Sequence, residues 1–436
     1  MSLRAGAVAL RALMAAADRA ALARSGAEFG VFPEPPRISF RKIRDHVAAI
    51  IGRGRAEVSP HFLAAQGIEL IRGTGAFADP STLRAGDTEI KARRFVIATG
   101  AHLVRPDIPG LLSVPYFTTE TIFDNTRKLT HLVIAGAGPM GIELALAHRR
   151  LGCEVTLIDQ GNALAHCDPE LADIALSRLR DEGVVLHESS AVVAIQARSQ
   201  GIGVVVRARD ESIQLDASHI LVAPERLPNL FDLNLDAARI RRSKSEPGAL
   251  SLSPSLRTTN PRVWAVGEAA GHAPSPHLSQ IEADIVVRAA LLGLQSRYDP
   301  AAIPRVTLTD PPIAEIGLTE GVARTRFRTG FSVFRASYAE TDMARAARQS
   351  LGVVKMMVAR DGRILGAGIV GPAAPELAAL FALAIEMKLP AARLAELTAP
   401  YPSYSDLIRR LGEMAAAGAP LGALEQRLFQ LNRLLR

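Results

Sequence analysis

The pattern of apolar and polar positions is clearest between residues 131 and 159. A short apolar run, Leu132–Ala135, has the length and composition of a strand, and a second run, Glu154–Ile158, follows it. The stretch between them, from about Pro139 to Leu151, has helical spacing. Strand, helix and strand in this order predict a βαβ unit of an α/β fold.

The pattern on both sides of this unit predicts further helices and short strands. Residues 1–30 have helical spacing, and we interpret them as a structural helix, although their Ala- and Arg-rich composition would also suit a transit peptide. The expected helices that follow are Phe40–Gln66, Asp168–Gly183 and His277–Leu294. The expected strands are Ile68–Arg72, Gly73–Ala78, Thr88–Lys91, Arg94–Ala98, Val184–His187, Ala191–Ala197, Ile202–Ala208, His219–Ala223 and Arg262–Val266.

The pattern changes at Pro304. Strand and hairpin signals dominate from there, with helices expected at Pro375–Met387 and Ala391–Glu396, so a separate α+β domain is predicted. The last segment, Leu421–Arg436, places its leucines on one helical face. Such a stripe usually packs on its own domain or on a partner subunit, and binding to a membrane surface is the less favoured alternative.

Composition and charge exclude several classes of protein. The chain has 436 residues, enough for two or three domains, and its net charge of +7 comes from arginines spread along the sequence. No basic-aromatic tract or zinc-finger spacing indicates nucleic-acid binding, and no apolar run is long enough to insert stably into a bilayer. The two cysteines, Cys153 and Cys167, have no metal-ligand spacing, so we predict no metal site and a cytoplasmic location.

The turn between the two strands carries the candidate chemistry. Gly136, Gly138 and Gly141 have the spacing G-x-G-x-x-G, in which the glycines allow a tight turn, close approach of a pyrophosphate and close packing of the helix. Pro139 and Met140 open the helix, whose N-terminal N–H groups face the phosphates. Asp159 ends the second strand and can accept hydrogen bonds from a ribose diol, whereas it would repel a 2′-phosphate. This pattern predicts NAD(H) in preference to NADP(H).

Several further segments accompany this unit along the chain. They are Ala98-Thr99-Gly100, LRTTNPRVWAVGEAAG at 256–271, VTLTDPPIAEIGLTE at 306–320, GRILGAGIVG at 362–371 and APYPSYSD at 399–406. With them, the chain from about Gly6 to Asp406 resembles the flavoprotein pyridine nucleotide-disulfide oxidoreductases, the family of dihydrolipoamide dehydrogenase and mercuric reductase. The resemblance implies Rossmann-like FAD- and NAD(P)-binding domains, followed by a C-terminal α+β interface domain that forms a homodimer.

The resemblance also implies domain boundaries and site residues. An FAD domain, residues 1–125 and 255–302, would be interrupted by an NAD domain at 126–254, and an interface domain at 303–412 would precede a tail at 413–436. Glu143 would lie near the nicotinamide. The positions that touch FAD in the family are Gly75, Thr99, Gly100 and Gly267, with Glu268 in place of the aspartate that binds the ribitol. Tyr401 and Asp406 occupy the positions of a catalytic His–Glu pair.

The chain departs from the family in ways that bear on its chemistry. The first G-x-G-x-x-G, which holds the FAD pyrophosphate in the family, is missing, so the FAD domain is incomplete and FAD binding is in doubt. Ser2 and Ala7 fall at the two redox-cysteine positions, and Arg11 replaces the lysine that follows them. The usual A-T-G at the end of the NAD domain becomes Ala223-Pro224-Glu225.

These losses leave three hypotheses. The first and preferred one is an FAD-dependent NAD(H) oxidoreductase that passes electrons to a non-thiol acceptor, because dithiol exchange and Hg(II) reduction both need the missing thiolates. The second is a catalytically degenerate, dimeric NAD-binding scaffold or regulator. The third is a misplaced start codon, and a strand followed by G-x-G-x-x-G in the upstream reading frame would support it.

Overall fold

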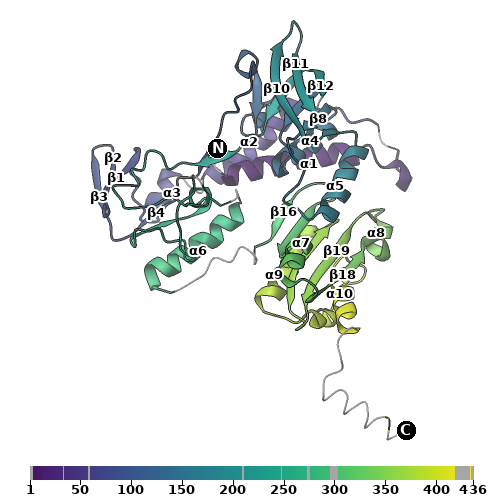
Figure 1. Cartoon of the computed structure of the whole chain (residues 1–436). Coiled ribbons are helices and arrows are strands. Elements are labelled where there is room, and N and C mark those ends of the chain that lie inside the picture. Colours follow the sequence, from purple (N-terminus) through teal and green to yellow (C-terminus); the bar gives the residue numbers. More distant parts are fainter. Residues whose placement is uncertain are drawn as a thin grey trace. The chain divides into compact units, whose positions relative to one another are not determined.

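A computed structural model describes residues 3–32, 34–56, 59–208, 211–246, 248–272, 275–294, 303–417 and 433 (Figure 1). The chain forms two compact units. The first consists of Met1–Asn162 and Glu182–Asp299, and the second of Ala163–Asp181 and Pro300–Arg436. Each unit is described by itself below.

The centre of the first unit is a five-stranded parallel sheet in the order β6-β13-β7-β8-β9. Its strands are β6 (Tyr116–Thr118), β7 (His131–Ala135), β8 (Glu154–Ile158), β9 (Val185–His187) and β13 (His219–Val222). Helix α4 (Pro139–Arg150) connects β7 to β8 as expected. The strands are apolar on both faces, as the middle of a parallel sheet requires, and Leu132, Val133 and Ile134 are fully buried.

A three-stranded antiparallel sheet follows in the first unit. It contains β10 (Ser190–Ala197), β11 (Ile202–Ala208) and β12 (Glu211–Ala217) in that order. We did not expect β12, because its apolar content is limited to Ile213, Leu215 and Ala217 between polar, mostly exposed residues. These three residues nevertheless alternate with polar ones, the pattern of a half-buried strand, and β12 pairs with β11 along its whole length.

The N-terminal part of the first unit is helical. It contains α1 (Leu3–Leu22), α2 (Phe40–Ala56) and α3 (Pro60–Ala65). The expectation of one helix over Phe40–Gln66 is wrong, because a new helix begins at Ser59, whose hydroxyl caps the N–H of Phe62 at 3.2 Å. Helix α1 is attached to α4 by the ion pair between Asp18 and the buried Arg150 (2.7 Å).

Short strands and one helix complete the first unit. The strands are β1 (Gly75–Asp79), β2 (Thr82–Ala85) and β3 (Thr88–Lys91) in one antiparallel sheet, β4 (Phe95–Ile97) parallel to β15 (Val263–Ala265), and β5 (Ala101–Leu103) antiparallel to β14 (Arg226–Pro228). Helix α6 (Pro276–Leu292) packs on the β15 residue Trp264 through Ile285 and Val286. The strand expected at Ile68–Arg72 does not form, and Ile68 and Leu70 are about half exposed.

The second unit contains a five-stranded antiparallel sheet in the order β16-β17-β20-β19-β18. The strands are β16 (Arg305–Thr307), β17 (Ile313–Gly317), β18 (Phe331–Ser337), β19 (Val353–Ala359) and β20 (Ile364–Val370). The helices are α5 (Pro169–Asp181), α7 (Glu320–Phe327), α8 (Asp342–Ala346), α9 (Ala374–Glu386) and α10 (Asp406–Ala417). The segment Ala391–Glu396, expected to be helical, is a 3₁₀ helix.

Different helices pack on the two faces of this sheet, as the alternate side chains of β19 show. Val354, Met356 and Val358 pack with residues of α9 and α10 in one core cluster. Met357 and Ala359 point to the opposite face, where α7 contributes Ala323. Lys355 lies on this second face and is almost completely buried.

The described residues include no helix that is both long and apolar enough to cross a membrane. The leucines of the stripe expected in the tail at Leu421–Arg436 all fall outside the described residues.

Candidate functional site

The glycine turn after β7 has the geometry that its spacing predicts. Gly136 has φ +116°, in the region that favours glycine, and a Cβ there would lie 3.0 Å from the carbonyl oxygen of Ala223. A Cβ on Gly141 would overlap the carbonyl oxygen of Gly136. Both glycines are therefore required by the protein's own packing.

Gly138 differs from the other two glycines, because a Cβ on it would meet no protein atom within 4 Å. It is the N-cap of α4, and no side chain caps the helix there. The first bond within the helix runs from the N–H of Ile142 to the carbonyl of Gly138 (3.1 Å), so the N–H groups of Met140 and Gly141 precede it without a helical acceptor. Open space in front of free N–H groups at a helix N-terminus fits a pyrophosphate.

The carboxylate of Asp159 lies against this turn. One oxygen accepts the N–H of Ala137 at 2.6 Å, and the other accepts the N–H of Gly161 at 2.8 Å. Each carboxylate oxygen has a further lone pair that a sugar hydroxyl could use. The residues present at the turn therefore fit a nicotinamide dinucleotide, with Asp159 holding the loop and carrying the charge that would repel a 2′-phosphate.

Glu143 lies in α4, two residues after Gly141, with only 5% of its surface exposed. The expected place of this side chain near the nicotinamide stays a prediction.

Two of the positions expected to touch FAD line a cavity of about 560 Å³ in the first unit. Gly75 and Thr99 share it with the aromatic pair Phe77 and Phe95, whose rings meet edge to face at 5.3 Å. The hydroxyl of Thr99 donates to the carbonyl of Asn229 at 2.8 Å. A cavity with apolar, partly aromatic walls and backbone at its edge is suited to a flat ring system.

Gly100 and Gly267 both have positive φ angles, +68° and +64°. Nothing lies within 4 Å of a Cβ built on Gly100. The N–H of Gly267 donates to Glu282, a fully buried carboxylate on α6 that also binds the imidazole of His272 at 2.5 Å. The turn at Gly267 is therefore fixed from within the protein.

Glu268, expected at the ribitol, already has a partner. Its Oε1 accepts the Nε of Arg226 at 2.5 Å, and Arg226 also contacts Glu120 (3.0 Å) and the carbonyl of Ala101 (2.9 Å). Burial acts to lower the Arg226 pKa, but these carboxylates outweigh it and raise the pKa. The sequence shows no sign of this contact, because Arg226 and Glu268 are far apart in the chain.

The cavity walls thus suit the ring system of a flavin, whereas the first G-x-G-x-x-G, expected from the resemblance to hold the FAD pyrophosphate, is missing from the sequence. A flavin ribitol could bind Glu268 only if this carboxylate gave up its hydrogen bond to Arg226 or accepted a second one beside it.

The chain matches the family described as pyridine nucleotide-disulphide oxidoreductase over residues 6–284, and the dimerisation domain of that family over residues 303–411. This chain belongs to the pyridine nucleotide-disulphide oxidoreductase family. The expected family and fold class are therefore confirmed: an α/β fold with FAD/NAD-binding domains and a C-terminal dimerisation domain.

The similar relatives include mercuric reductases and dihydrolipoyl dehydrogenases. A mercuric reductase of Streptomyces lividans is 29% identical over 411 residues, 93% of this chain and 86% of the relative. A dihydrolipoyl dehydrogenase of Geobacillus stearothermophilus is 28% identical over 431 residues, 95% of this chain and 88% of the relative. Among solved structures, LpdA of Mycobacterium tuberculosis has a TM-score of 0.83 at 22% identity and covers 93% of this chain and 89% of its own. The flavoprotein disulfide reductase RclA of Escherichia coli, as a Cu(II) complex, has a TM-score of 0.80 at 24% identity, with 93% and 89% covered.

Unlike a dithiol enzyme of this oxidoreductase family, the chain has no cysteine pair. Its two cysteines are free thiols, Cys153 in the first unit and Cys167 in the second, and both are buried. Burial raises the pKa of both thiols, that of Cys167 to about 12 with help from Glu315. Ala7, expected at a redox-cysteine position, and Arg11, expected in place of the lysine that follows, are exposed residues of α1. Among the described residues no group of three or more His, Cys, Asp or Glu side chains could hold a metal ion.

Tyr401 and Asp406, expected at the positions of the family's His–Glu pair, have separate partners. The Tyr401 hydroxyl donates to Asp342 at 2.8 Å, and this bond raises the Tyr401 pKa. Asp406 accepts from Arg410 (2.7 Å) and Arg409 (2.6 Å). Burial favours the neutral form of Asp406, but the two arginines hold its pKa below the usual value. Tyr401 therefore stays protonated at neutral pH and could donate a proton or hydrogen bond, but could not act as a base.

Proposed function

We propose that this member of the family is an FAD-dependent oxidoreductase that uses NADH and passes electrons to a non-thiol acceptor such as a quinone, dioxygen or a dye. The observation that carries the proposal is the glycine turn, which is complete at Gly136, Gly138 and Gly141 and bordered by Asp159. The thiols that dithiol chemistry needs are not paired.

The protein's own contribution to the reaction is binding and orientation. The N–H groups of Met140 and Gly141 would hold the pyrophosphate, and Asp159 would accept from the adenosine ribose. Gly75, Thr99, Gly100 and Gly267 would border the flavin, and Glu268 would face its ribitol. The chemistry that FAD supplies when bound is acceptance of a hydride from the nicotinamide and release of the electron pair to a second acceptor. For a two-electron acceptor A the balance is NADH + H⁺ + A → NAD⁺ + AH₂.

We further propose that the chain works as a homodimer formed through its C-terminal dimerisation domain. In this arrangement Tyr401, with 81% of its surface exposed, would be available to the other subunit. The cytoplasmic location inferred from the low cysteine content stays part of this proposal.

A second candidate function is a dimeric NAD-binding scaffold without turnover. The bond between Glu268 and Arg226 supports it, because it engages the carboxylate that would otherwise bind the ribitol. The two functions share the NADH site and differ only in whether a flavin is held.

Purified protein separates these functions. The enzyme would be yellow, or would become so with added FAD, and would oxidise NADH with ferricyanide or dichlorophenolindophenol. The scaffold would bind NADH but remain colourless and inactive with dyes. A protein that takes up no FAD and shows no dye reduction would contradict the first proposal.

A further inference from the structure

The chain between β8 and β9 leaves the first unit and folds with the second. In a βαβ unit the crossover helix usually covers the sheet whose strands it connects. Here Ala163–Asp181, which contains α5, groups with the C-terminal residues, while Asn162 and Glu182 on either side belong to the first unit. Leu171 on α5 is fully buried, and β20 approaches it closely at Gly368, where a Cβ would lie 2.8 Å from Leu171 Cδ1.

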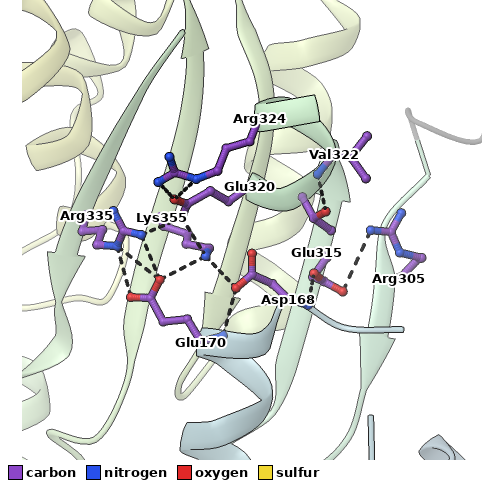
Figure 2. Close-up of polar contacts among 10 residues, drawn as sticks. Asp168, Glu170, Arg305, Glu315, Glu320, Val322, Arg324, Arg335 and Lys355 are labelled. Carbon is purple, nitrogen blue, oxygen red and sulfur yellow. Dashed lines mark hydrogen bonds and ion pairs between the residues drawn. The ribbon is translucent and has the colours of Figure 1, made fainter. Parts of the chain in front are cut away.

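A buried lysine binds this segment to the sheet. Figure 2 shows Lys355 extending from its strand toward three carboxylates. Its Nζ lies 2.6 Å from Asp168, 3.0 Å from Glu170 and 3.2 Å from Glu320. Lys355 is 1% exposed and Asp168 3% exposed, so the ammonium group is withdrawn from water and its three carboxylate partners compensate for the lost hydration.

Two further contacts secure the same end of the segment. Arg335 on β18 contacts Glu170 at 3.0 Å and Glu320 at 2.6 Å. The backbone N–H of Asp168 donates to Glu315 on β17 at 3.0 Å. The start of α5 is thus held by side chains of β18 and β19 and by a carboxylate of β17 (Figure 2).

The same, N-terminal end of the segment follows directly on the nucleotide loop. Asp159 and Gly161, whose N–H the Asp159 carboxylate binds, precede Ala163 by only a few residues. The loop is closed against the end of β9 by bonds from Ser189 N to Gly161 O (2.9 Å) and from Ser190 N to Asp159 O (2.7 Å). Asp159 thus lies in a loop that the first unit holds at Asp159 and Gly161 and that continues, from Ala163, into a segment of the second unit.

We propose that Ala163–Asp181 is a strap through which the dimerisation domain controls the affinity of the NADH site, with Lys355 as its lock. The strap is fixed at Asp168 and Glu170 and ends at the Asp159 loop. Release of the lock frees the loop and weakens NADH binding, and by reciprocity NADH binding tightens the strap. This inference rests on the proposed binding of NADH at the glycine turn.

The test compares wild type, Lys355→Met and Arg363→Met as full-length proteins. Methionine keeps the apolar length of Lys355 and removes its ammonium group, with the contacts to the three carboxylates. Arg363 is an exposed cation beside β20 that pairs with Asp361 at 3.7 Å, so it serves as the matched control. Hydrogen exchange of peptides from 163–181 reports on the strap, and NADH fluorescence titration reports on the site.

In Lys355→Met the strap amides exchange at least about tenfold faster, because breaking a buried pair costs more than the ~1.4 kcal/mol that tenfold represents. The NADH affinity of this variant falls about fivefold, which is the low end of the range usual for the coupling between two sites of a protein. Arg363→Met changes neither quantity, and NADH slows strap exchange in the wild type. Should Lys355→Met fail to fold, Asp168→Asn replaces it, because it keeps the side-chain shape and leaves Lys355 two carboxylates.

Faster strap exchange with unchanged NADH affinity would overturn the strap while leaving the proposed function intact. A wild type that binds no NADH would refute the proposed function itself, and the strap's role with it. The two failures are therefore distinguishable.

Discussion

Replacement of Gly138 by alanine separates ligand binding from folding in this protein. Gly138 has φ −70° and ψ 178°, which alanine adopts without strain, and the added Cβ meets no protein atom within 4 Å. The folded state therefore tolerates the methyl group. We expect unchanged stability, or a gain of about 0.4–1 kcal/mol from the reduced freedom of the unfolded chain.

The same methyl group would occupy the space through which a pyrophosphate approaches the N–H groups of Met140 and Gly141. Loss of one such charge-assisted hydrogen bond costs about 1.5–3 kcal/mol. Because each 1.4 kcal/mol is tenfold in affinity, Gly138→Ala should weaken NADH binding about 10- to 100-fold.

Two assays on the same samples test this expectation: NADH fluorescence titration and thermal unfolding without ligand. Gly321→Ala is the matched control, since a Cβ on this α7 glycine also meets nothing within 4 Å and lies in the other unit. Wild-type NADH affinity in Gly138→Ala would refute the assignment of the turn as the pyrophosphate site. A large loss of stability would refute the claim that the space is empty.

Three further predictions concern the charges around the site and in the second unit. Asp159→Asn should weaken NADH binding about tenfold and reduce the preference for NADH over NADPH, because it removes the charge that repels a 2′-phosphate. Equal affinity of the wild type for NADH and NADPH would contradict this prediction. Glu268→Asp shortens the side chain by one methylene and should weaken its bond to Arg226. FAD uptake, measured by absorbance at 450 nm, should therefore increase. Unchanged uptake would show that this bond does not limit flavin binding. The hydrogen bonds from Arg335 lower the Glu170 pKa below 4.5, so this carboxylate stabilises the fold above pH 4.5 and the contribution is lost as pH falls through the lowered pKa. The difference in melting temperature between wild type and Glu170→Gln should therefore stay constant above pH 4.5 and narrow as the pH falls further below it. A difference that does not change on acidification would argue against the ion pairs.

Local sequence determined how well each element could be predicted. The unit β7–α4–β8 was predicted to within about one residue at its ends, because an apolar run, a glycine turn and a helical pattern follow one another without interruption. The strand expected at Ile68–Arg72 failed, since its apolar residues found no buried partner. β12 was missed although Ile213, Leu215 and Ala217 alternate with polar residues, because the segment is short and mostly polar and exposed.

The charged contacts of the site and of the strap could not be predicted in the same way. Lys355 looks out of place in the apolar run GVVKMMVA, but the sequence does not indicate Asp168, 187 residues away, as its partner. Arg226 and Glu268 belong to segments that meet only in the folded unit. Partners at such separations follow from tertiary packing, which a single sequence does not specify.

Binding of NADH at the glycine turn underlies both proposed functions and the role of the strap. The most direct measurement is a titration of the purified full-length chain with NADH, followed by nicotinamide fluorescence, for wild type and Gly138→Ala in parallel. We predict saturation at one NADH per chain in the wild type, with a dissociation constant between about 1 μM and 1 mM as is usual for such substrates, and much weaker binding in the variant. Absence of saturable binding in a folded wild-type protein would show that the glycine turn is not an NADH site.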